Sequence, residues 1–174
     1  IKEFQPRLVC VDNSEQAREL RETFREGNSG TETEFVWGVE GLVQVSSDPE
    51  VDLVVAGIVG AAGLKPTYSA VQAGKTVAVA NKEPLVMAGE LFVQTANKTG
   101  AKLLPTDSEH NAIFQALHGE PLERIARLIL TASGGPFRDL PLKEFEKITL
   151  AEALSHPNWE MGRKISIDSA TMMN

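Results

Sequence analysis

The sequence predicts an α/β protein with an open parallel sheet, followed by a second region of α+β structure. In the first 106 residues, short apolar segments alternate with longer amphipathic ones, which is the order of βαβ units. Hydrophobic residues make up 42% and charged residues 24% of the 174-residue chain, the proportions of a globular protein. This length suffices for one substantial α/β domain or one and a half smaller ones.

The overall charge and the single cysteine exclude several classes of protein. Seventeen basic and 24 acidic residues give a net charge of −7, which argues against general nucleic-acid binding. The longest apolar run, 53–64, is shorter than the ~18 residues of a membrane span, so we expect no membrane partner. Cys10 alone forms neither an intrachain disulfide nor a structural cysteine-zinc site. Because residue 1 is Ile, without an initiator Met or leader, we expect a piece of a longer soluble protein.

Apolar segments in the first region predict parallel strands at 7–11, 34–38, 52–56, 76–80 and 102–104. The segment 52–56 is apolar throughout, which is typical of a strand that helices cover on both faces. Strands joined by helices at these spacings indicate right-handed crossovers. Residues 1–106 therefore resemble much of a Rossmann-like domain.

Helices are predicted between these strands. The first begins after Asn13, an N-cap with Gln16 as its capping-box partner, and ends at Gly27. Its apolar stripe consists of Ala17, Leu20 and Phe24. Gly100 ends the last of these helices. The others are predicted at 40–45, 63–74 and 85–97.

The pattern changes after Pro105, so we place a domain boundary near Thr106, giving domains 1–106 and 107–174. The second region is predicted to contain a helix at 109–117 and a strand at 124–131. Alternation of polar and apolar residues predicts another strand at 164–168. Two short helices, at 142–148 and 150–154, are expected between them.

Gly57, Gly60 and Gly63 follow a predicted strand and precede a helix, as the glycines of a nucleotide-phosphate loop do. Their spacing differs from the dinucleotide fingerprint G-x-G-x-x-G, and close packing around a turn explains them equally well. The sequence Asn81-Lys82-Glu83 ends the next strand. It favours a ligand site, because open α/β sheets bind ligands at the carboxyl ends of their strands.

Asp107 and Glu109 flank Ser108 after the last strand of the first region. If the backbone is extended there, the two carboxylates face the same way and suit Mg²⁺ or Mn²⁺. A helix N-terminus has the same residue types, and taken alone this structural explanation is the stronger. We interpret His110 as a residue of the first helical turn and not as a ligand, and His118 as a surface residue.

Two hydroxyl-bearing turns and one histidine mark the second region. Ser133 precedes two glycines and Ser169 follows a predicted strand, and such turns hold phosphate through hydroxyl and N–H groups. Turn chemistry alone explains both equally well. His156 lies in a loop with Trp159, where a functional role is favoured. In the structural alternative, His156 caps the preceding helix and Trp159 fills the core.

Five segments together carry a family resemblance: GIVGAAGLKPT, AVANKEPLV, LLPTDSEHNAIFQAL, LTASGGPFRDLPL and SHPNWEMGRKISIDSATMMN. In this order and spacing they resemble the 1-deoxy-D-xylulose 5-phosphate reductoisomerases of non-mevalonate isoprenoid biosynthesis. They span 57–174, about two thirds of the chain, and the first fifty residues are less distinctive.

The resemblance implies an NADPH-dependent oxidoreductase and isomerase that requires Mn²⁺ or Mg²⁺. Its substrate is a phosphorylated ketose, 1-deoxy-D-xylulose 5-phosphate, which rearranges by retro-aldol cleavage and re-addition. Hydride transfer then gives 2-C-methyl-D-erythritol 4-phosphate. The resemblance also implies a homodimer in the bacterial cytoplasm or the plastid stroma, with the cytoplasm preferred.

The resemblance assigns roles by position. It implies metal ligands at Asp107 and Glu109, and NADPH contacts at Asn81, Glu83 and Gly162. The implied catalytic residues are Lys82, Glu109 and His156, and the loop of His156 and Trp159 resembles a lid over the substrate. The implied substrate contacts are Lys82, Ser108, Glu109, Ser133, His156, Ser169 and Asn174.

Parts of the family's site are expected outside these 174 residues. The resemblance places a glycine-rich dinucleotide loop before Ile1, and a phosphate-binding Lys and a third metal carboxylate after Asn174. The loop 57–63 is then a second wall of the cofactor cleft, and we expect no turnover from the chain alone. Two alternatives stay open: a generic NAD(P)-dependent dehydrogenase without a rearrangement, and a non-catalytic dinucleotide-binding module.

Overall fold

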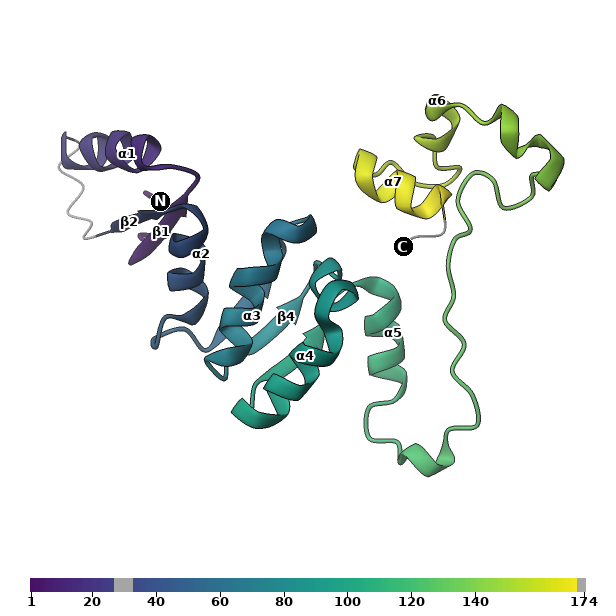
Figure 1. Ribbon diagram of the computed structural model, residues 1–174, viewed down its shortest axis with the longest axis horizontal. Coiled ribbons are helices and arrows are strands. Elements are labelled where there is room, and N and C mark those ends of the chain that lie inside the picture. The colour runs from purple at the N-terminus through teal and green to yellow at the C-terminus, as the bar shows by residue number, and fades with distance from the viewer. Residues whose placement is uncertain (27–32, 172–174) are drawn as a thin grey trace. The chain divides into compact units, whose positions relative to one another are not determined.

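The computed structural model describes residues 1–26 and 33–171 (Figure 1). It divides into two compact units, unit 1 at 1–114 and unit 2 at 115–174, which are described separately. Gly27, the predicted end of the first helix, and Asn174, a predicted substrate contact, lie outside the described residues. Among the described residues, no helix is both long and apolar enough to cross a membrane.

Unit 1 begins with two parallel strands and their helices. These are β1 (Leu8–Val11), α1 (Ser14–Glu26), β2 (Glu34–Trp37) and α2 (Gly38–Ser47). β1 pairs with β2 in register, Leu8 opposite Glu34. The predicted N-cap is confirmed, since Asn13 Oδ1 accepts a 3.0 Å hydrogen bond from the Gln16 N–H. In a capping box the Gln16 side chain would accept from the Asn13 N–H. Here Gln16 Oε1 accepts from the Asp12 N–H instead, at 3.2 Å.

A three-stranded parallel sheet follows, with strand order β3-β4-β5. This confirms the predicted succession of strands and crossover helices. Gly100 caps α4 with φ +77°, a left-handed conformation that glycine adopts without strain. The elements are β3 (Leu53–Ala56), the 3₁₀ helix η1 (Gly60–Gly63), α3 (Leu64–Gln72), β4 (Thr76–Val79), α4 (Glu83–Thr99), β5 (Lys102–Pro105) and α5 (Ser108–Ala116).

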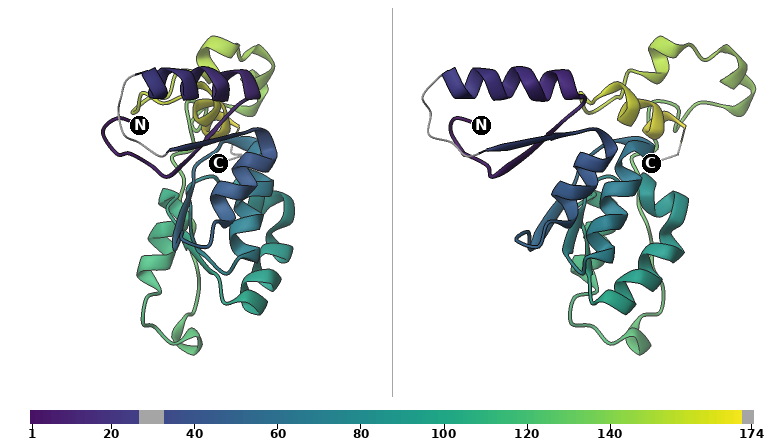
Figure 2. Two further views of the ribbon diagram at one scale, coloured as in Figure 1. Left: turned by 90° about the vertical axis from the view of Figure 1, so that its left-hand side faces the viewer. Right: turned by 60° about the vertical axis from the view of Figure 1, so that its left-hand side comes forward.

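The apolar core of unit 1 lies between this sheet and the helices α3 and α4, which lie side by side (Figures 1 and 2). Burial of this apolar surface is the main stabilising contribution. It anchors β4 and therefore fixes the position of the residues that follow the strand. The buried cluster consists of Ala56, Ala70, Val71, Val77, Val79, Phe92 and Ala96.

Two expectations about the sheet need correction. The described strands form two separate sheets, β1-β2 and β3-β4-β5, instead of one. The prediction that 52–56 is covered on both faces is also wrong, because Leu53 and Val55 are 52% and 68% exposed. Successive side chains of a strand point to opposite faces. Ala56 joins the core beside α3 and α4, and Leu53 and Val55 point away from it.

Unit 2 has little regular structure. Its elements are η2 (Leu122–Arg124), η3 (Leu142–Lys147), α6 (Leu150–Ala153) and α7 (Arg163–Ala170). The two predicted short helices are confirmed as η3 and α6, the first of them a 3₁₀ helix.

Both strands predicted for the second region are wrong. Residues 125–135 form neither helix nor strand, and Leu128, Ile129 and Leu130 are exposed. A strand is stable only when another strand pairs with it, and none of the described strands pairs with this segment. The segment 164–168 lies inside α7, where Ser166 and Ser169 are buried. Their spacing of three residues places them on one helical face. The alternation of polar and apolar residues over 164–168 is too short to reveal this helical spacing.

Candidate functional site

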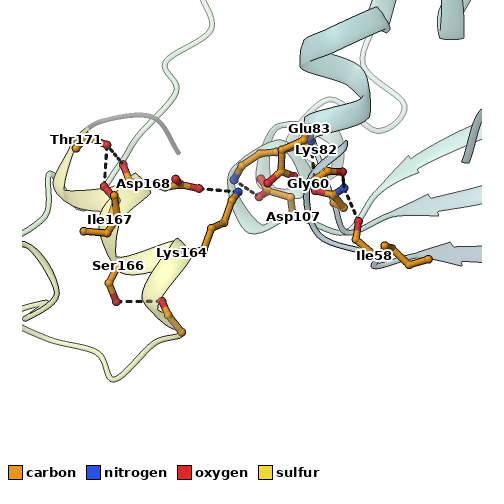
Figure 3. A network of polar contacts seen from close by, with 12 residues as sticks. Ile58, Gly60, Lys82, Glu83, Asp107, Lys164, Ser166, Ile167, Asp168 and Thr171 are labelled. Carbon is orange, nitrogen blue, oxygen red and sulfur yellow. Dashed lines mark hydrogen bonds and ion pairs between the residues drawn. The ribbon is translucent and has the colours of Figure 1, made fainter. Parts of the chain in front are cut away.

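The carboxyl ends of β4 and β5 bring two predicted site residues together. Lys82 follows β4 and directly precedes α4, whereas Asp107 follows β5 and directly precedes α5. Because the two strands are parallel neighbours, these ends meet at one edge of the sheet. Lys82 Nζ lies 2.7 Å from Asp107 Oδ2, and both side chains are largely buried (Figure 3). The pair is therefore an ordered ion pair of opposite charges.

Asp107 is held at both carboxylate oxygens. Its Oδ1 lies 2.7 Å from His110 Nδ1. Burial alone would raise the pKa of Asp107, but the hydrogen bonds from Lys82 and His110 outweigh burial and lower the pKa to about 2. Asp107 is therefore ionised at neutral pH. The sequence interpretation of His110 missed this contact, although its position three residues after Asp107 at a helix start was a signal.

The common face of Asp107 and Glu109, which was conditional on an extended backbone, is absent. The Asp107 carbonyl accepts a 2.8 Å bond from the Asn111 N–H, so α5 begins at once and the backbone is not extended. Residues two apart on a helix do not face the same way. Glu109 Oε2 accepts a 2.8 Å bond from the Ser108 hydroxyl. The structural explanation, a helix N-terminus rich in acidic and hydroxyl residues, therefore accounts for this spacing.

The acidic residues at the start of α5 nevertheless fit part of a divalent-metal site. Asp107 offers an ionised carboxylate, and a metal ion bound there would replace its contact with the Lys82 ammonium. Mg²⁺ is commonly held by only one or two protein carboxylates, with water and substrate oxygens completing its shell. Among the described residues, no group of three His, Cys, Asp or Glu could hold a metal ion. The chain thus supplies two candidate ligands, Asp107 and Glu109.

The glycine loop 57–63 is tied to the end of β4. Gly60 has φ +74°, and a Cβ on Gly63 would lie 2.5 Å from the Ile58 carbonyl oxygen. Packing and turn geometry therefore explain these two glycines. They do not explain Gly57, where a Cβ would have no neighbour within 4 Å and φ is not positive. The open space at Gly57, beside the carboxyl end of β3, fits the approach of a cofactor.

Asn81 and Glu83 adjoin this loop. The side chain of Asn81 is buried and donates to the carbonyl oxygens of Ile58 and Gly60 at 2.6 and 3.1 Å. Glu83 begins α4, and its N–H donates to Asn81 Oδ1 at 3.4 Å. The predicted ligand edge is therefore a connected structure made from the ends of β3 and β4.

In unit 2, His156 is fixed by its own loop. Its Nδ1 accepts hydrogen bonds from the N–H groups of Asn158 and Trp159 at 3.1 and 3.2 Å. This network assigns the proton of the neutral ring to Nε2, which lies 3.1 Å from Ser133 Oγ. The Trp159 ring stacks on the imidazole at 4.8 Å between centroids and is 57% exposed. The structural alternative, a helix-capping His156 and a core Trp159, is therefore wrong.

Ser133 and Ser169 meet in this unit, with 2.9 Å between their hydroxyl oxygens. Ser169 lies within α7, not after a strand as expected. Gly135, to which the sequence interpretation gave no role beyond its place in the turn, makes the approach possible, since a Cβ on it would lie 2.6 Å from the Ser169 carbonyl oxygen. Its place in a Ser-Gly-Gly turn was the available signal. Gly162 directly precedes α7, and its carbonyl accepts from Ser166 (Figure 3).

The hydrogen bonds of His156 exclude it as the base that would activate Ser133 as a nucleophile. A serine nucleophile needs a base whose nitrogen accepts the hydroxyl proton. His156 Nε2 carries a proton in the assigned tautomer, and its other nitrogen is held by two N–H donors. Ser133 is therefore not an activated nucleophile in this arrangement. His156, Ser133 and Ser169 instead form a cluster of polar hydrogens suited to an oxygen-rich ligand.

Two family models match the chain. Residues 1–89 match 1-deoxy-D-xylulose 5-phosphate reductoisomerase, and residues 103–174 match the C-terminal domain of 1-deoxy-D-xylulose 5-phosphate reductoisomerase.

Curated proteins that are similar to this chain carry the same name, 1-deoxy-D-xylulose 5-phosphate reductoisomerase. The protein of Glaesserella parasuis is 52% identical over 99% of this chain and 46% of its own length. That of Pseudomonas fluorescens is 55% identical over 97% of this chain and 43% of its own length. The chain thus spans a little under half the length of the curated relatives it matches.

Solved structures of reductoisomerases also resemble this chain in fold and sequence. A DOX-P reductoisomerase in complex with NADPH, fosmidomycin and magnesium superposes with a TM-score of 0.83 at 47% identity, over 99% of this chain and 44% of that one. The Zymomonas mobilis enzyme in complex with NADPH gives 0.83 at 42% identity, over 97% and 42%. These likenesses establish the α/β fold with its Rossmann-like first part. This chain belongs to the 1-deoxy-D-xylulose 5-phosphate reductoisomerase family.

Proposed function

We propose that the protein to which these residues belong is an NADPH- and divalent-metal-dependent isomeroreductase of isoprenoid biosynthesis. It converts 1-deoxy-D-xylulose 5-phosphate to 2-C-methyl-D-erythritol 4-phosphate by retro-aldol and aldol rearrangement and hydride reduction. The observation that carries the proposal is the ion pair of Lys82 with an ionised Asp107 at the carboxyl ends of neighbouring parallel strands. Solved relatives with NADPH and magnesium support it.

We assign two domain portions within that protein. Residues 1–106 form the later part of the NADPH-binding domain, and residues 107–174 form the first part of the catalytic domain. The end of β5 at Pro105 supports a boundary near Thr106. The two family models are consistent with this division, because one ends at residue 89 and the other begins at 103.

In this proposal, Asp107 and Glu109 bind Mg²⁺ or Mn²⁺, and a further carboxylate comes from another part of the protein. When bound, the metal supplies Lewis-acid polarisation of carbonyl and hydroxyl oxygens, and NADPH supplies the hydride. Lys82 keeps the Asp107 carboxylate ionised and provides a positive charge for substrate oxygens. Ser108, bonded to Glu109, is a further substrate contact.

The hydroxyl and imidazole cluster of unit 2 binds the phosphorylated substrate. His156 presents an Nε2 proton. Ser133 Oγ lies 3.1 Å from this Nε2 and 2.9 Å from Ser169 Oγ. All three side chains can therefore donate to phosphate oxygens. Asn174 joins them by family resemblance. The loop with the exposed Trp159 acts as a lid that excludes water from the reacting fragments.

By family resemblance, we assign NADPH contacts to Asn81 and Glu83 in unit 1 and to Gly162 in unit 2. The open backbone at Gly57 supports a cofactor there. We also propose a homodimer, and location in the cytoplasm, which the bacterial origin of the relatives supports.

The first test compares this 174-residue chain with the full-length protein, by which we mean a polypeptide of the relatives' length that contains these residues. NADPH oxidation is measured with 1-deoxy-D-xylulose 5-phosphate and Mn²⁺. We expect turnover from the full-length protein and none from the chain, because the chain provides two candidate metal carboxylates and no cluster of three among its described residues. Turnover by the chain would contradict the assignment of the site. Turnover that continues after metal removal would favour the generic dehydrogenase, and NADPH binding without any turnover would favour the binding module.

The second test is Glu109→Gln in the full-length protein. Gln keeps the size of the side chain but removes the charge that binds a hard cation. We expect turnover to fall at least about a hundredfold, weaker Mn²⁺ binding by electron paramagnetic resonance, and nearly unchanged NADPH affinity. Glu40→Gln, at an exposed acid in the first turn of α2, is the matched control. Loss of NADPH binding with retained Mn²⁺ binding would show that Glu109 serves the fold or the cofactor instead.

A further inference from the structure

We infer that Asn81 is a positioning residue for NADPH: its side-chain amide holds the glycine loop 57–63 in the shape that faces the cofactor, and does not itself contact the cofactor. The inference rests on the proposed function and refines it, because family resemblance assigns Asn81 simply to the cofactor. The contacts of the side chain indicate the narrower role.

The amide of Asn81 is fully used within the protein. A side-chain amide has two N–H donors. Nδ2 of Asn81 donates to the carbonyl oxygens of Ile58 at 2.6 Å and Gly60 at 3.1 Å. The amide oxygen accepts from the Glu83 N–H at 3.4 Å. The residue is also only 6% exposed. The side chain therefore has neither a donor nor an open surface to offer a ligand.

These contacts determine which side of the loop faces outward. The described chain has no cis peptide bond, and in a trans peptide the carbonyl and the following N–H point in opposite directions. Because the Ile58 carbonyl points to Asn81, the Val59 N–H points away from it. The side chains of Ile58 and Val59 are 40% and 63% exposed. The outer face of the loop thus offers a backbone donor beside apolar groups, which suits a flat, polar-edged ring.

The inner face of the loop is closed tightly around Asn81. A Cβ on Gly63 would lie 3.1 Å from Asn81 Nδ2 as well as 2.5 Å from the Ile58 carbonyl oxygen. Gly60, whose carbonyl is the second acceptor, has φ +74°. If the amide were removed, two carbonyl groups would lose their partner at a place with little room for a replacement. The loop would then rearrange, and the outer face would change with it.

The test uses Asn81→Asp in the full-length protein. Asp has nearly the same shape, but its carboxylate cannot donate and would face two carbonyl oxygens. We expect hydrogen exchange of residues 57–63 without ligand to rise at least about tenfold, and the Kd of NADPH to rise at least about tenfold. Asn97→Asp, the same change at an exposed position of α4, should change neither quantity.

The outcomes separate the inference from the proposed function. Weaker NADPH binding with unchanged exchange in 57–63 would mean a direct contact and overturn the positioning role. Faster exchange with unchanged NADPH affinity would also overturn it, because the loop would not serve the cofactor. Failure of the unaltered protein to bind NADPH would contradict the proposed function itself. If circular dichroism shows that Asn81→Asp is unfolded, Gly60→Ala disturbs the same loop from the backbone side, and the same two readouts decide.

Discussion

Unit 1 and unit 2 differ in the interactions that stabilise each of them internally. Unit 1 buries a continuous apolar cluster between β3, β4, α3 and α4, with Phe92 and Val77 fully inaccessible. In the described part of unit 2, the residues classed as buried are Gly135, Ser166 and Ser169. Large apolar side chains there, such as Leu128 and Leu142, are exposed.

The difference explains where the sequence prediction succeeded. A βαβ succession carries its pairing partners within the same stretch of chain, so the strands of unit 1 form together with their helices. The apolar segment 124–131 has no described partner strand in either unit. Its Leu128, Ile129 and Leu130 are therefore exposed. Unit 2 is therefore ordered by turns, caps and the polar contacts around His156.

The largest expected effect is on the apolar core. Phe92→Ala should lower the free energy of unfolding of unit 1 by about 3–5 kcal/mol, because it leaves a cavity among buried side chains. Leu128→Ala should change stability by less than about 0.5 kcal/mol, because Leu128 is already exposed. Urea unfolding of the 174-residue chain, followed by circular dichroism, measures both. Equal losses from the two substitutions would contradict the contrast between the units.

A smaller effect concerns the ion pair of unit 1. The folded-state pKa of Asp107, about 2, is below the ~3.9 of an unfolded chain, so the folded state favours the ionised form. After allowance for solvent screening of this partly exposed group, Asp107→Asn should therefore cost about 1–2 kcal/mol at pH 7. This cost should be fully present above pH ~4 and disappear as the pH falls toward 2. Urea unfolding between pH 7 and 3 with a chelator measures it, with Asp52→Asn, at an exposed acid, as control. A cost that is independent of pH would mean that the charge of Asp107 does not stabilise the fold.

The smallest effect concerns a helix cap in unit 2. Thr149 Oγ1 accepts from the Glu152 N–H at 3.3 Å, and Glu152 Oε2 accepts from the Thr149 N–H at 2.8 Å, which forms a capping box at α6. Thr149→Ala should destabilise α6 by about 1 kcal/mol, seen as faster hydrogen exchange of residues 152–154. Thr131→Ala, at an exposed threonine outside helices and strands, should leave that exchange unchanged. Unchanged exchange of residues 152–154 in Thr149→Ala would contradict the stabilising role of this cap.

Residue patterns predicted much of the candidate site but not its connections. The positions of Lys82 and Asp107 after their strands could be read from the order of elements. The contact between them, and the bond of Asp107 to His110, could not, because they depend on which strands are neighbours and how α5 starts. The extended backbone considered at Asp107 and the strand predicted at 164–168 are both absent, for one reason. Patterns of three to five residues do not distinguish helix from strand.

The sequence by itself determined the βαβ order of unit 1, its helix caps and the family to which the chain belongs, because these depend on local pattern and on motif spacing. Only the tertiary structure decided that Asn81 points into the glycine loop, that His156 is held as a donor beside Ser133, and that β3 has an open face. Each of these depends on which backbone groups lie within about 3 Å in space, a distance that residue order along the chain does not fix.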